Sequence, residues 1–435
     1  SGYLYLFVII SNILFNMFNI KLNPLWSKTV LVITFSFLLL LSSYVLIDPK
    51  GSAKNLLSIY NFFAINFESL FLYIGFGVLV FLVVIAFSKS GSRKIVLEGR
   101  SDYSYFSWYS MLFATGMGAA LLYWSTYEWL VYYTNPIEGE NQSLLKARSY
   151  PLFHWMFTGW ALYILPTVAF VFSLMKNPNT PLTFSGILLK EQSGPIRILL
   201  DTFFIGAILT GAGVGLALSF PLMSAAISKL FGLNQTIYLD FVMLLICMCI
   251  VSISVYRGLQ NGIKKLSNFN IILVISFLTL ILITGPTKYI VINTFEPVTY
   301  VLKNYLSLSL LKSQYSLDWT VFYWAWYIAL APAVGAFIVN ISNNKTVREL
   351  IFGALIVGSL GCIFHIGVLS NISIYAYENG ILDAPKIYAD QSMTSHALVI
   401  ETISSLDYGT FFLILFTIIA VVFLCTTYDL SLIHI

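Results

Sequence analysis

Long apolar runs separated by short polar segments fill most of this 435-residue chain. A helix needs about 20 apolar residues to cross roughly 30 Å of hydrocarbon at 1.5 Å per residue. The stretches that meet this requirement predict ten membrane-spanning helices at 28–47, 67–88, 106–133, 151–175, 197–231, 237–256, 268–287, 319–341, 350–375 and 409–432. The pattern is typical of an all-α polytopic membrane protein.

Two further apolar stretches do not fit a span. Residues 3–20 are interrupted by three asparagines and lack the basic start and cleavage site of a signal peptide. We therefore expect an interfacial segment or a misread leader there. Residues 291–313 carry Lys303 and Lys312 beside apolar positions, which is typical of an amphipathic helix lying along a membrane surface.

Composition excludes several function classes. The chain is 58% hydrophobic and 10% charged, whereas soluble proteins hold about 25% charged residues. A soluble enzyme and a nucleic-acid binder are therefore excluded, and the lipid bilayer is the expected surroundings. With a cytoplasmic amino terminus, 14 of the 23 Lys and Arg residues fall on cytoplasmic segments, as the positive-inside rule requires.

Glycines interrupt two of the predicted spans. Gly116 and Gly118 lie in the middle of the third, where each weakens a helix by about 1 kcal/mol relative to alanine. Unwound backbone at this depth is tolerated where it lines a cavity, and it can present carbonyl groups to a cation. Close helix packing is the alternative interpretation. The fifth span, with Gly206, Gly211 and Pro221, allows the same two interpretations.

Aromatic residues gather in the fourth and eighth predicted spans. Trp155, Trp160 and Tyr163 fall within an arc of about 140° on a continuous helix, and residues 319–327 hold three tryptophans and two tyrosines. Such residues often form belts at the membrane interface. A tryptophan and a tyrosine deeper in a span instead indicate a cage that binds a quaternary ammonium by cation–π attraction. No catalytic residue and no cofactor is expected.

These motifs resemble the betaine/choline/carnitine transporter family over residues 22–435. The resemblance rests on Phe153-His154-Trp155, Trp160, Tyr163, residues 319–326, residues 340–349, residues 114–118, residues 258–268 and residues 423–429. It implies two peripheral helices followed by two inverted repeats of five helices, in the sodium-symporter-like arrangement. On that template, residues 1–100 hold the amino-terminal segment and peripheral helices. Residues 101–315 hold the first repeat and the amphipathic helix. Residues 316–435 hold a second repeat without its last two helices.

The implied function is secondary active transport across the cell membrane, with import of glycine betaine, choline or carnitine coupled to sodium. Some family members form homotrimers. The alternatives are a sodium-independent substrate:product antiporter of the same family and a non-functional truncated remnant. An ion channel is a further class, but it would show rings of charge or carbonyl groups rather than an aromatic cage.

The resemblance also assigns residues to the two binding sites. The substrate site would hold Trp155, Trp160, Tyr163, Trp326, Tyr327, Met117 and Gly118. The sodium site would hold the carbonyl groups of Ala114, Met117 and Phe423 and the hydroxyl groups of Thr426 and Thr427. Family members usually carry tryptophan at 327, often an aromatic residue at 330 and often glycine at 120, where this chain has Tyr327, Leu330 and Ala120.

Ionisable and hydroxyl groups inside the spans have ordinary interpretations as well. Residues 423, 426 and 427 share one helix face, but threonines in membrane helices often bond back to a carbonyl of the preceding turn. For Glu128 we expect a structural or gating role. For His154 we expect a hydrogen bond between helices rather than proton transfer.

Overall fold

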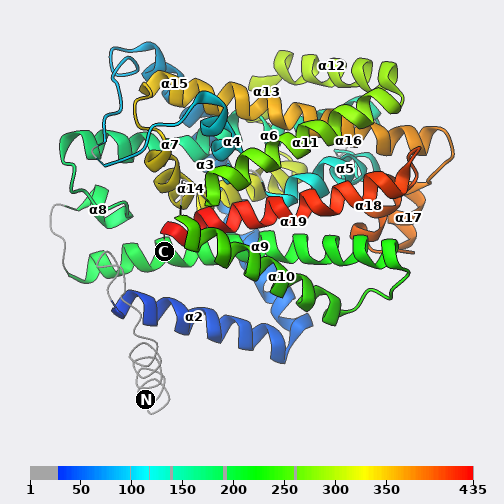
Figure 1. Ribbon diagram of the computed structural model, residues 1–435, viewed down its shortest axis with the longest axis horizontal. Coiled ribbons are helices and arrows are strands. Elements are labelled where there is room, and N and C mark those ends of the chain that lie inside the picture. Colours follow the sequence, from blue (N-terminus) through cyan, green and yellow to red (C-terminus); the bar gives the residue numbers. More distant parts are fainter. Residues whose placement is uncertain are drawn as a thin grey trace.

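The computed structural model describes residues 28–97, 99–116, 118–137, 141–189, 194–258 and 262–434. These residues are almost entirely α-helical; within them, the one β-type pairing is an isolated antiparallel bridge between Lys94 and Thr346. The long helices run side by side from one end of the molecule to the other (Figure 1). The predicted interfacial segment at 3–20 lies outside the described residues.

Within the described ranges, nine helical segments are long and apolar enough to cross a membrane. They are α2 (Lys28–Ile47), α3 (Pro49–Phe87), α6 with α7 (Leu144–Trp155 and Phe157–Lys176), α9 (Pro195–Phe231), α10 (Ile237–Gly258), α11 (Lys264–Thr284), the π-helical turn η2 with α14 (Ser316–Thr320 and Val321–Ile341), α15 with the π-helical turn η3 and α16 (Val347–Phe352, Gly353–Gly358 and Ser359–Glu378), and α19 (Gly409–His434). Each corresponds to a predicted span, so the all-α multi-pass architecture is confirmed.

The third predicted span is broken at the glycine pair. Helix α4 (Tyr105–Gly116) ends there, and α5 (Ala119–Thr134) begins after Gly118, whose backbone is extended at φ −104° and ψ −165°. Each half is too short to cross a membrane alone, which is why this span is not among the nine. The predicted interruption of the third span is confirmed.

Two other interruptions differ from the sequence prediction. The fourth span is divided at Met156, which ends α6 and precedes α7 with φ −90° and ψ −140°. The fifth span is one continuous helix, α9, despite its glycines and Pro221. A Cβ atom on Gly211 would lie 2.7 Å from Leu330 Cδ2. Gly211 therefore allows close approach of α9 and α14, which favours the packing interpretation of the fifth span.

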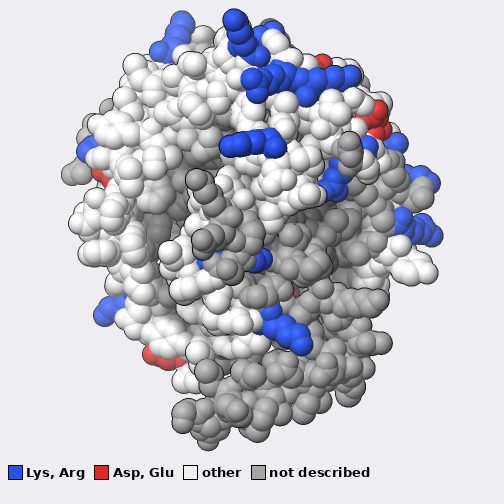
Figure 2. Space-filling model, turned by 90° about the vertical axis from the view of Figure 1, so that its left-hand side faces the viewer, with Lys and Arg blue, Asp and Glu red and all other residues white. Residues whose placement is uncertain are grey.

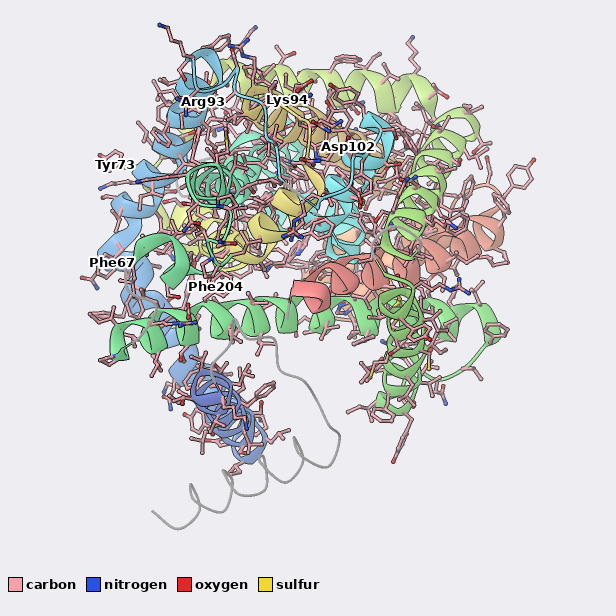
Figure 3. All side chains as sticks on the ribbon, turned by 60° about the vertical axis from the view of Figure 1, so that its left-hand side comes forward. Phe67, Tyr73, Arg93, Lys94, Asp102 and Phe204 are labelled. Carbon is pink, nitrogen blue, oxygen red and sulfur yellow. The ribbon has the colours of Figure 1, made fainter. Side chains whose placement is uncertain are left out.

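Helix α3 begins 18 residues earlier than the apolar pattern predicts. The side chain of Asp48 accepts a hydrogen bond from the Gly51 amide at 2.9 Å, and Pro49 takes the first helical position. A capping aspartate and a proline at the first position both favour the start of a helix, so the polar residues that follow them are also helical. Figure 3 shows Phe67 and Tyr73 of α3 pointing away from the bundle, as expected for a lipid-facing peripheral helix.

Shorter helices occupy the ends and the flank of the bundle. They are α8 (Phe184–Leu188), α12 (Thr287–Lys303), α13 (Tyr305–Ser309), α17 (Ala384–Asp390) and α18 (Ser395–Ser404). The predicted amphipathic helix is α12 followed by α13, and it starts four residues earlier than expected. In Figure 1, α8 and α15 lie at the left-hand end of the molecule, and α17 and α18 at the right-hand end.

Candidate functional site

A cavity lies beside the break between α4 and α5. Its walls come from α4, α5, α6, α7, α9, α14 and α19. Five of the predicted substrate residues line it: Gly118, Trp155, Tyr163, Trp326 and Tyr327. Met117, predicted for both sites, lies outside the described residues. The structure thus brings residues from three separate predicted spans to one place.

Three pairs of aromatic rings around the cavity meet edge to face, whereas Trp326 and Tyr327 are stacked nearly parallel, with ring centroids 6.3 Å apart and an interplanar angle of 11°. The ring centroid of Trp155 lies 6.1 Å from that of Trp326 and 6.2 Å from that of Tyr327, with both pairs at 88°. Tyr163 meets Tyr327 at 5.0 Å and 82°. Perpendicular rings present π faces in different directions, which is the arrangement that surrounds a compact cation.

Trp160 lies behind this cavity rather than in its described wall. Its ring stacks on Phe113 at 5.9 Å, and it meets Tyr163 edge to face at 6.3 Å. A Cβ atom on Gly358 would lie 2.3 Å from the indole, and one on Gly116 would lie 2.8 Å from it. Trp160 is therefore packed on several sides, and the direct contact that it supplies is to the ring of Tyr163.

The three positions that depart from the family pattern all line the cavity. Tyr327 is fully buried in α14, Leu330 lies one turn further along the same helix, and Ala120 belongs to the first turn of α5. A Cβ atom on Gly159 would lie 2.8 Å from the ring of Tyr327, so the backbone of α7 closely approaches this side chain. The side chains at all three positions therefore form part of the cavity wall.

A buried polar network supports one wall of the cavity, and the sequence prediction did not identify it. Glu128 in α5 is fully buried and accepts hydrogen bonds from Trp155 Nε1 at 2.8 Å and from the Tyr132 hydroxyl at 2.6 Å. His154 Nδ1 lies 3.1 Å from the Tyr132 hydroxyl and 3.6 Å from Glu128 Oε1. The Glu128 carboxylate therefore holds the indole of Trp155 in its position at the cavity wall.

The second ring nitrogen of His154 also has a hydrogen-bonding partner. Its Nε2 atom lies 3.1 Å from the Thr320 hydroxyl at the start of the eighth span. His154 thereby connects α6 with η2, which agrees with the expected hydrogen bond between helices. The sequence signal that could have found the whole network was the presence of ionisable residues at 128 and 154 inside apolar stretches, since such residues are expensive in a membrane unless paired.

The predicted sodium residues lie on two helices that pack together. Ala114 is buried in the last turn of α4, and Phe423 and Thr426 are buried in α19. The rings of Phe113 and Phe423 are 6.3 Å apart. Because the last four carbonyl groups of a helix point beyond its end, the end of α4 attracts a cation. The side chain of Thr427 lies outside the described part of the structure.

Thr426 makes the ordinary bond that the sequence allowed. Its hydroxyl donates to the Phe423 carbonyl, three residues earlier, at 2.8 Å. A hydroxyl that donates its proton in this way keeps its oxygen lone pairs for another group. Residues 114, 423 and 426 therefore supply neutral oxygen atoms, which suit a hard monovalent cation. Among the described residues, no cluster of three His, Cys, Asp or Glu side chains could hold a transition metal.

The cavity has an uncharged wall. Its described lining consists of aromatic, small and aliphatic side chains with the hydroxyl groups of Thr115 and Ser219, and the Glu128 carboxylate lies behind Trp155. Such a cavity can hold a permanent cation on π faces without forming an ion pair. Together with the helix arrangement, it defines a multi-pass membrane protein built around a buried aromatic cavity.

The chain belongs to the betaine/carnitine/choline transporter family (BCCT), whose sequence profile matches residues 29–435. The members of this family are transporters, not enzymes.

Curated relatives agree with this assignment. The chain is 29% identical over 367 residues to the carnitine transporter of Acinetobacter baumannii, which covers 81% of this chain and 66% of the relative. It is 31% identical over 428 residues to the glycine betaine/proline/choline/ectoine transporter of Vibrio parahaemolyticus, and this match covers 94% of the present chain and 74% of the relative. It is 29% identical over 318 residues to the high-affinity choline transport protein of Escherichia coli K12, and this match covers 69% of the present chain and 46% of the relative. The chain thus spans between about half and three quarters of the length of these relatives.

Proposed function

We propose that the full-length protein is a secondary active transporter that imports a quaternary-ammonium solute such as glycine betaine, choline or carnitine. The observation that carries this proposal is the convergence of Trp155, Tyr163, Trp326 and Tyr327 on one cavity beside a broken helix. Each ring face contributes about 0.5–2 kcal/mol to binding a cation, depending on how far it is desolvated.

The rest of the substrate needs hydrogen-bond partners. Trp326 lines the cavity, and its buried Nε1 atom has no acceptor among the described residues. Because a buried donor without an acceptor costs about 1–3 kcal/mol, a substrate oxygen that accepts this bond gains the same amount. The hydroxyl group of choline and the carboxylate of betaine or carnitine both offer such an oxygen. We infer that Trp326 contacts the polar end of the substrate.

Transport is coupled to sodium in this proposal. Ala114 lies two residues before the end of α4, and the same helix end supplies Thr115 and Gly116 to the cavity wall. A cation at Ala114, Phe423 and Thr426 would therefore stabilise the end of the broken helix that also shapes the substrate cavity. This shared element is the physical basis for coupling the two ligands.

The charge distribution supports a cytoplasmic amino terminus. Figure 2 shows the left-hand face of Figure 1, and Lys and Arg side chains clearly predominate over Asp and Glu there. Arg93 and Lys94, labelled in Figure 3, belong to the loop at this end that follows α3. Under the positive-inside rule we assign this face to the cytoplasm, and the opposite face, with α17 and α18, to the outside of the cell.

Uptake by proteoliposomes that contain the full-length protein tests the proposal. Labelled glycine betaine, choline and carnitine are offered separately under an inward sodium gradient, and again with potassium replacing sodium. We expect uptake of at least one of these solutes, with strong stimulation by sodium. Uptake in potassium that requires a counter-substrate inside the vesicles would identify an antiporter instead. No uptake of any quaternary-ammonium solute would contradict the proposal.

A further inference from the structure

A groove lies between the end of α10 and the start of α11, on the surface of the helix bundle. Ser254 and Arg257 line it from α10, and Lys265 and Phe269 line it from α11. Residues 254 and 257 are three positions apart and residues 265 and 269 are four apart, so each pair occupies one face of its helix. The groove shares no lining residue with the aromatic cavity, and it is therefore a separate candidate site.

The groove lies where the membrane-spanning parts of these helices end. The apolar segment of α10 that could cross a membrane is Ile237–Ser254, and that of α11 begins at Lys264. Two exposed apolar side chains of the lining, Ile253 and Phe269, are each four residues from a basic one, which places them about 6 Å further into the membrane. The groove thus has an apolar half at the level of the hydrocarbon and a basic half at the level of the lipid headgroups.

The basic half carries two positive charges and no negative one. Its described lining contains Arg257 and Lys265 but neither Asp nor Glu. Neither basic side chain forms an ion pair with a described residue. The neighbouring Lys264 is engaged elsewhere, with its Nζ atom 5.7 Å from the ring centroid of Tyr103. Two cations from adjacent helices at this level favour a ligand with a net negative charge, by about fivefold in affinity for each basic residue.

Ser254 distinguishes this groove from an ordinary basic surface. Its side chain is only 6% exposed, and its hydroxyl has no hydrogen-bond partner among the described residues. Serines in membrane helices usually donate to the carbonyl four residues earlier, as Ser252 of the same helix does to Met248 at 2.7 Å. A buried hydroxyl without a partner is unfavourable, so a ligand oxygen that accepts from Ser254 is favoured.

Gly262 preserves the space beside this hydroxyl. A Cβ atom on Gly262 would lie 2.1 Å from the Ser254 carbonyl oxygen and 3.0 Å from the Ser254 hydroxyl oxygen. The backbone just before α11 therefore approaches α10 closely, and only glycine allows this approach without a clash. Any side chain at position 262 would occupy the space next to Ser254.

We propose that this groove binds one anionic phospholipid. The phosphate group lies between Arg257 and Lys265, and the Ser254 hydroxyl donates to a phosphate or ester oxygen. An acyl chain lies along Ile253 and Phe269, which selects a lipid over a free phosphate ion. The two positive charges select a headgroup of net negative charge over a zwitterionic one. Because the groove shares no residue with the aromatic cavity or the predicted sodium site, the lipid site is independent of the substrate and of sodium coupling.

Lipid binding to the purified full-length protein in detergent, measured by native mass spectrometry, tests the proposal. The probes are phosphatidylglycerol and phosphatidylcholine with identical acyl chains, and inorganic phosphate serves as the competitor. The variant Arg257→Gln/Lys265→Gln removes both charges of the groove. Its matched control is Lys89→Gln/Lys176→Gln, which removes two exposed charges at the ends of α3 and α7. Thermal unfolding in the same detergent shows that each variant is folded.

We expect the parent to bind phosphatidylglycerol about tenfold or more tightly than phosphatidylcholine. Arg257→Gln/Lys265→Gln should lose about 30-fold in affinity for phosphatidylglycerol, and the control double variant should stay within about twofold of the parent. Ser254→Ala should lose about fivefold, whereas Lys265→Arg, which keeps the charge, should stay within about twofold. Phosphatidylglycerol should also raise the unfolding temperature of the parent, because it binds only the folded state.

Four results overturn the proposal. Equal affinities of the parent for the two lipids would mean that the headgroup charge is not recognised. An equal loss in Lys89→Gln/Lys176→Gln would assign the effect to overall charge rather than to the groove. Displacement of phosphatidylglycerol by millimolar inorganic phosphate would identify a simple anion site. If Arg257→Gln/Lys265→Gln does not fold, Lys265→Gln and Ser254→Ala replace it, and unchanged affinity in both would show that no lipid site exists here.

Discussion

Replacing Glu128 by leucine should weaken substrate binding without touching the cavity wall. The carboxylate accepts from Trp155 Nε1 at 2.8 Å and from the Tyr132 hydroxyl at 2.6 Å. Leucine has a similar size but no acceptor. Tyr132 would still reach His154 Nδ1 at 3.1 Å, whereas the Trp155 indole N–H loses the carboxylate acceptor that it has in Glu128.

The expected loss of substrate affinity depends on how the Trp155 ring responds when its N–H group has no acceptor. An indole N–H left unsatisfied in this fully buried site costs about 1–3 kcal/mol, and turning the ring away relieves that cost. A turned ring removes one aromatic face from the cavity, which weakens cation binding by about 1–2 kcal/mol, or roughly 5- to 30-fold in affinity. Glu128→Gln keeps one acceptor oxygen at the same place, so its loss should stay within about threefold.

Equilibrium binding of labelled choline and glycine betaine to the purified full-length protein measures these changes. Thermal unfolding in the same detergent shows whether each variant is folded. The expected order of affinity is parent, then Glu128→Gln, then Glu128→Leu. If Glu128→Leu unfolds at the parental temperature and binds both solutes as tightly as the parent, Glu128 does not position Trp155 for binding.

Three further changes test other parts of the structure. Tyr327→Trp enlarges one π face and should tighten substrate binding by about threefold in the same assay; weaker binding would mean that the cavity has no room for the larger ring. Thr426→Ala removes a predicted sodium ligand and should raise the sodium concentration for half-maximal uptake about tenfold, and an unchanged sodium dependence would remove Thr426 from the site. Gly211→Ala brings a Cβ atom to 2.7 Å from Leu330 and should destabilise the protein by about 1–3 kcal/mol in thermal unfolding, with recovery in the double variant Gly211→Ala/Leu330→Ala. If the double variant is no more stable than Gly211→Ala, a steric clash between α9 and α14 is not the cause of the destabilisation.

The helices could be predicted from the sequence because apolar run length alone fixes a membrane span. The break at Gly118 was one of two interpretations that the sequence allowed, since glycines at bilayer depth occur in unwound backbone and in close helix packing. The early start of α3 was missed because hydropathy outweighed the Asp48–Pro49 start signal. The glycines of α9 could not be assigned in advance, since the contact between Gly211 and Leu330 joins residues 119 positions apart.

The aromatic site could be predicted only in part. Placing Trp155 and Trp160 in one arc assumes a continuous helix, but Met156 interrupts it and changes the direction of the chain between them. Trp155 lines the cavity as a result, whereas Trp160 packs against Phe113 behind it. The partnership of Glu128 with Trp155 crosses two helices. The sequence indicates that Glu128 needs a buried partner, but it does not identify Trp155 as that partner.

The central claim is that the aromatic cavity binds its ligand through positive charge on the ammonium group. The most direct measurement compares choline with 3,3-dimethylbutan-1-ol, in which a neutral carbon replaces the nitrogen and the shape is nearly unchanged. Two desolvated ring faces at about 1 kcal/mol each predict that choline, or the best ammonium substrate against its own carbon analogue, binds roughly 30-fold more tightly to the full-length protein. Equal affinities for the charged and neutral compounds would contradict the account.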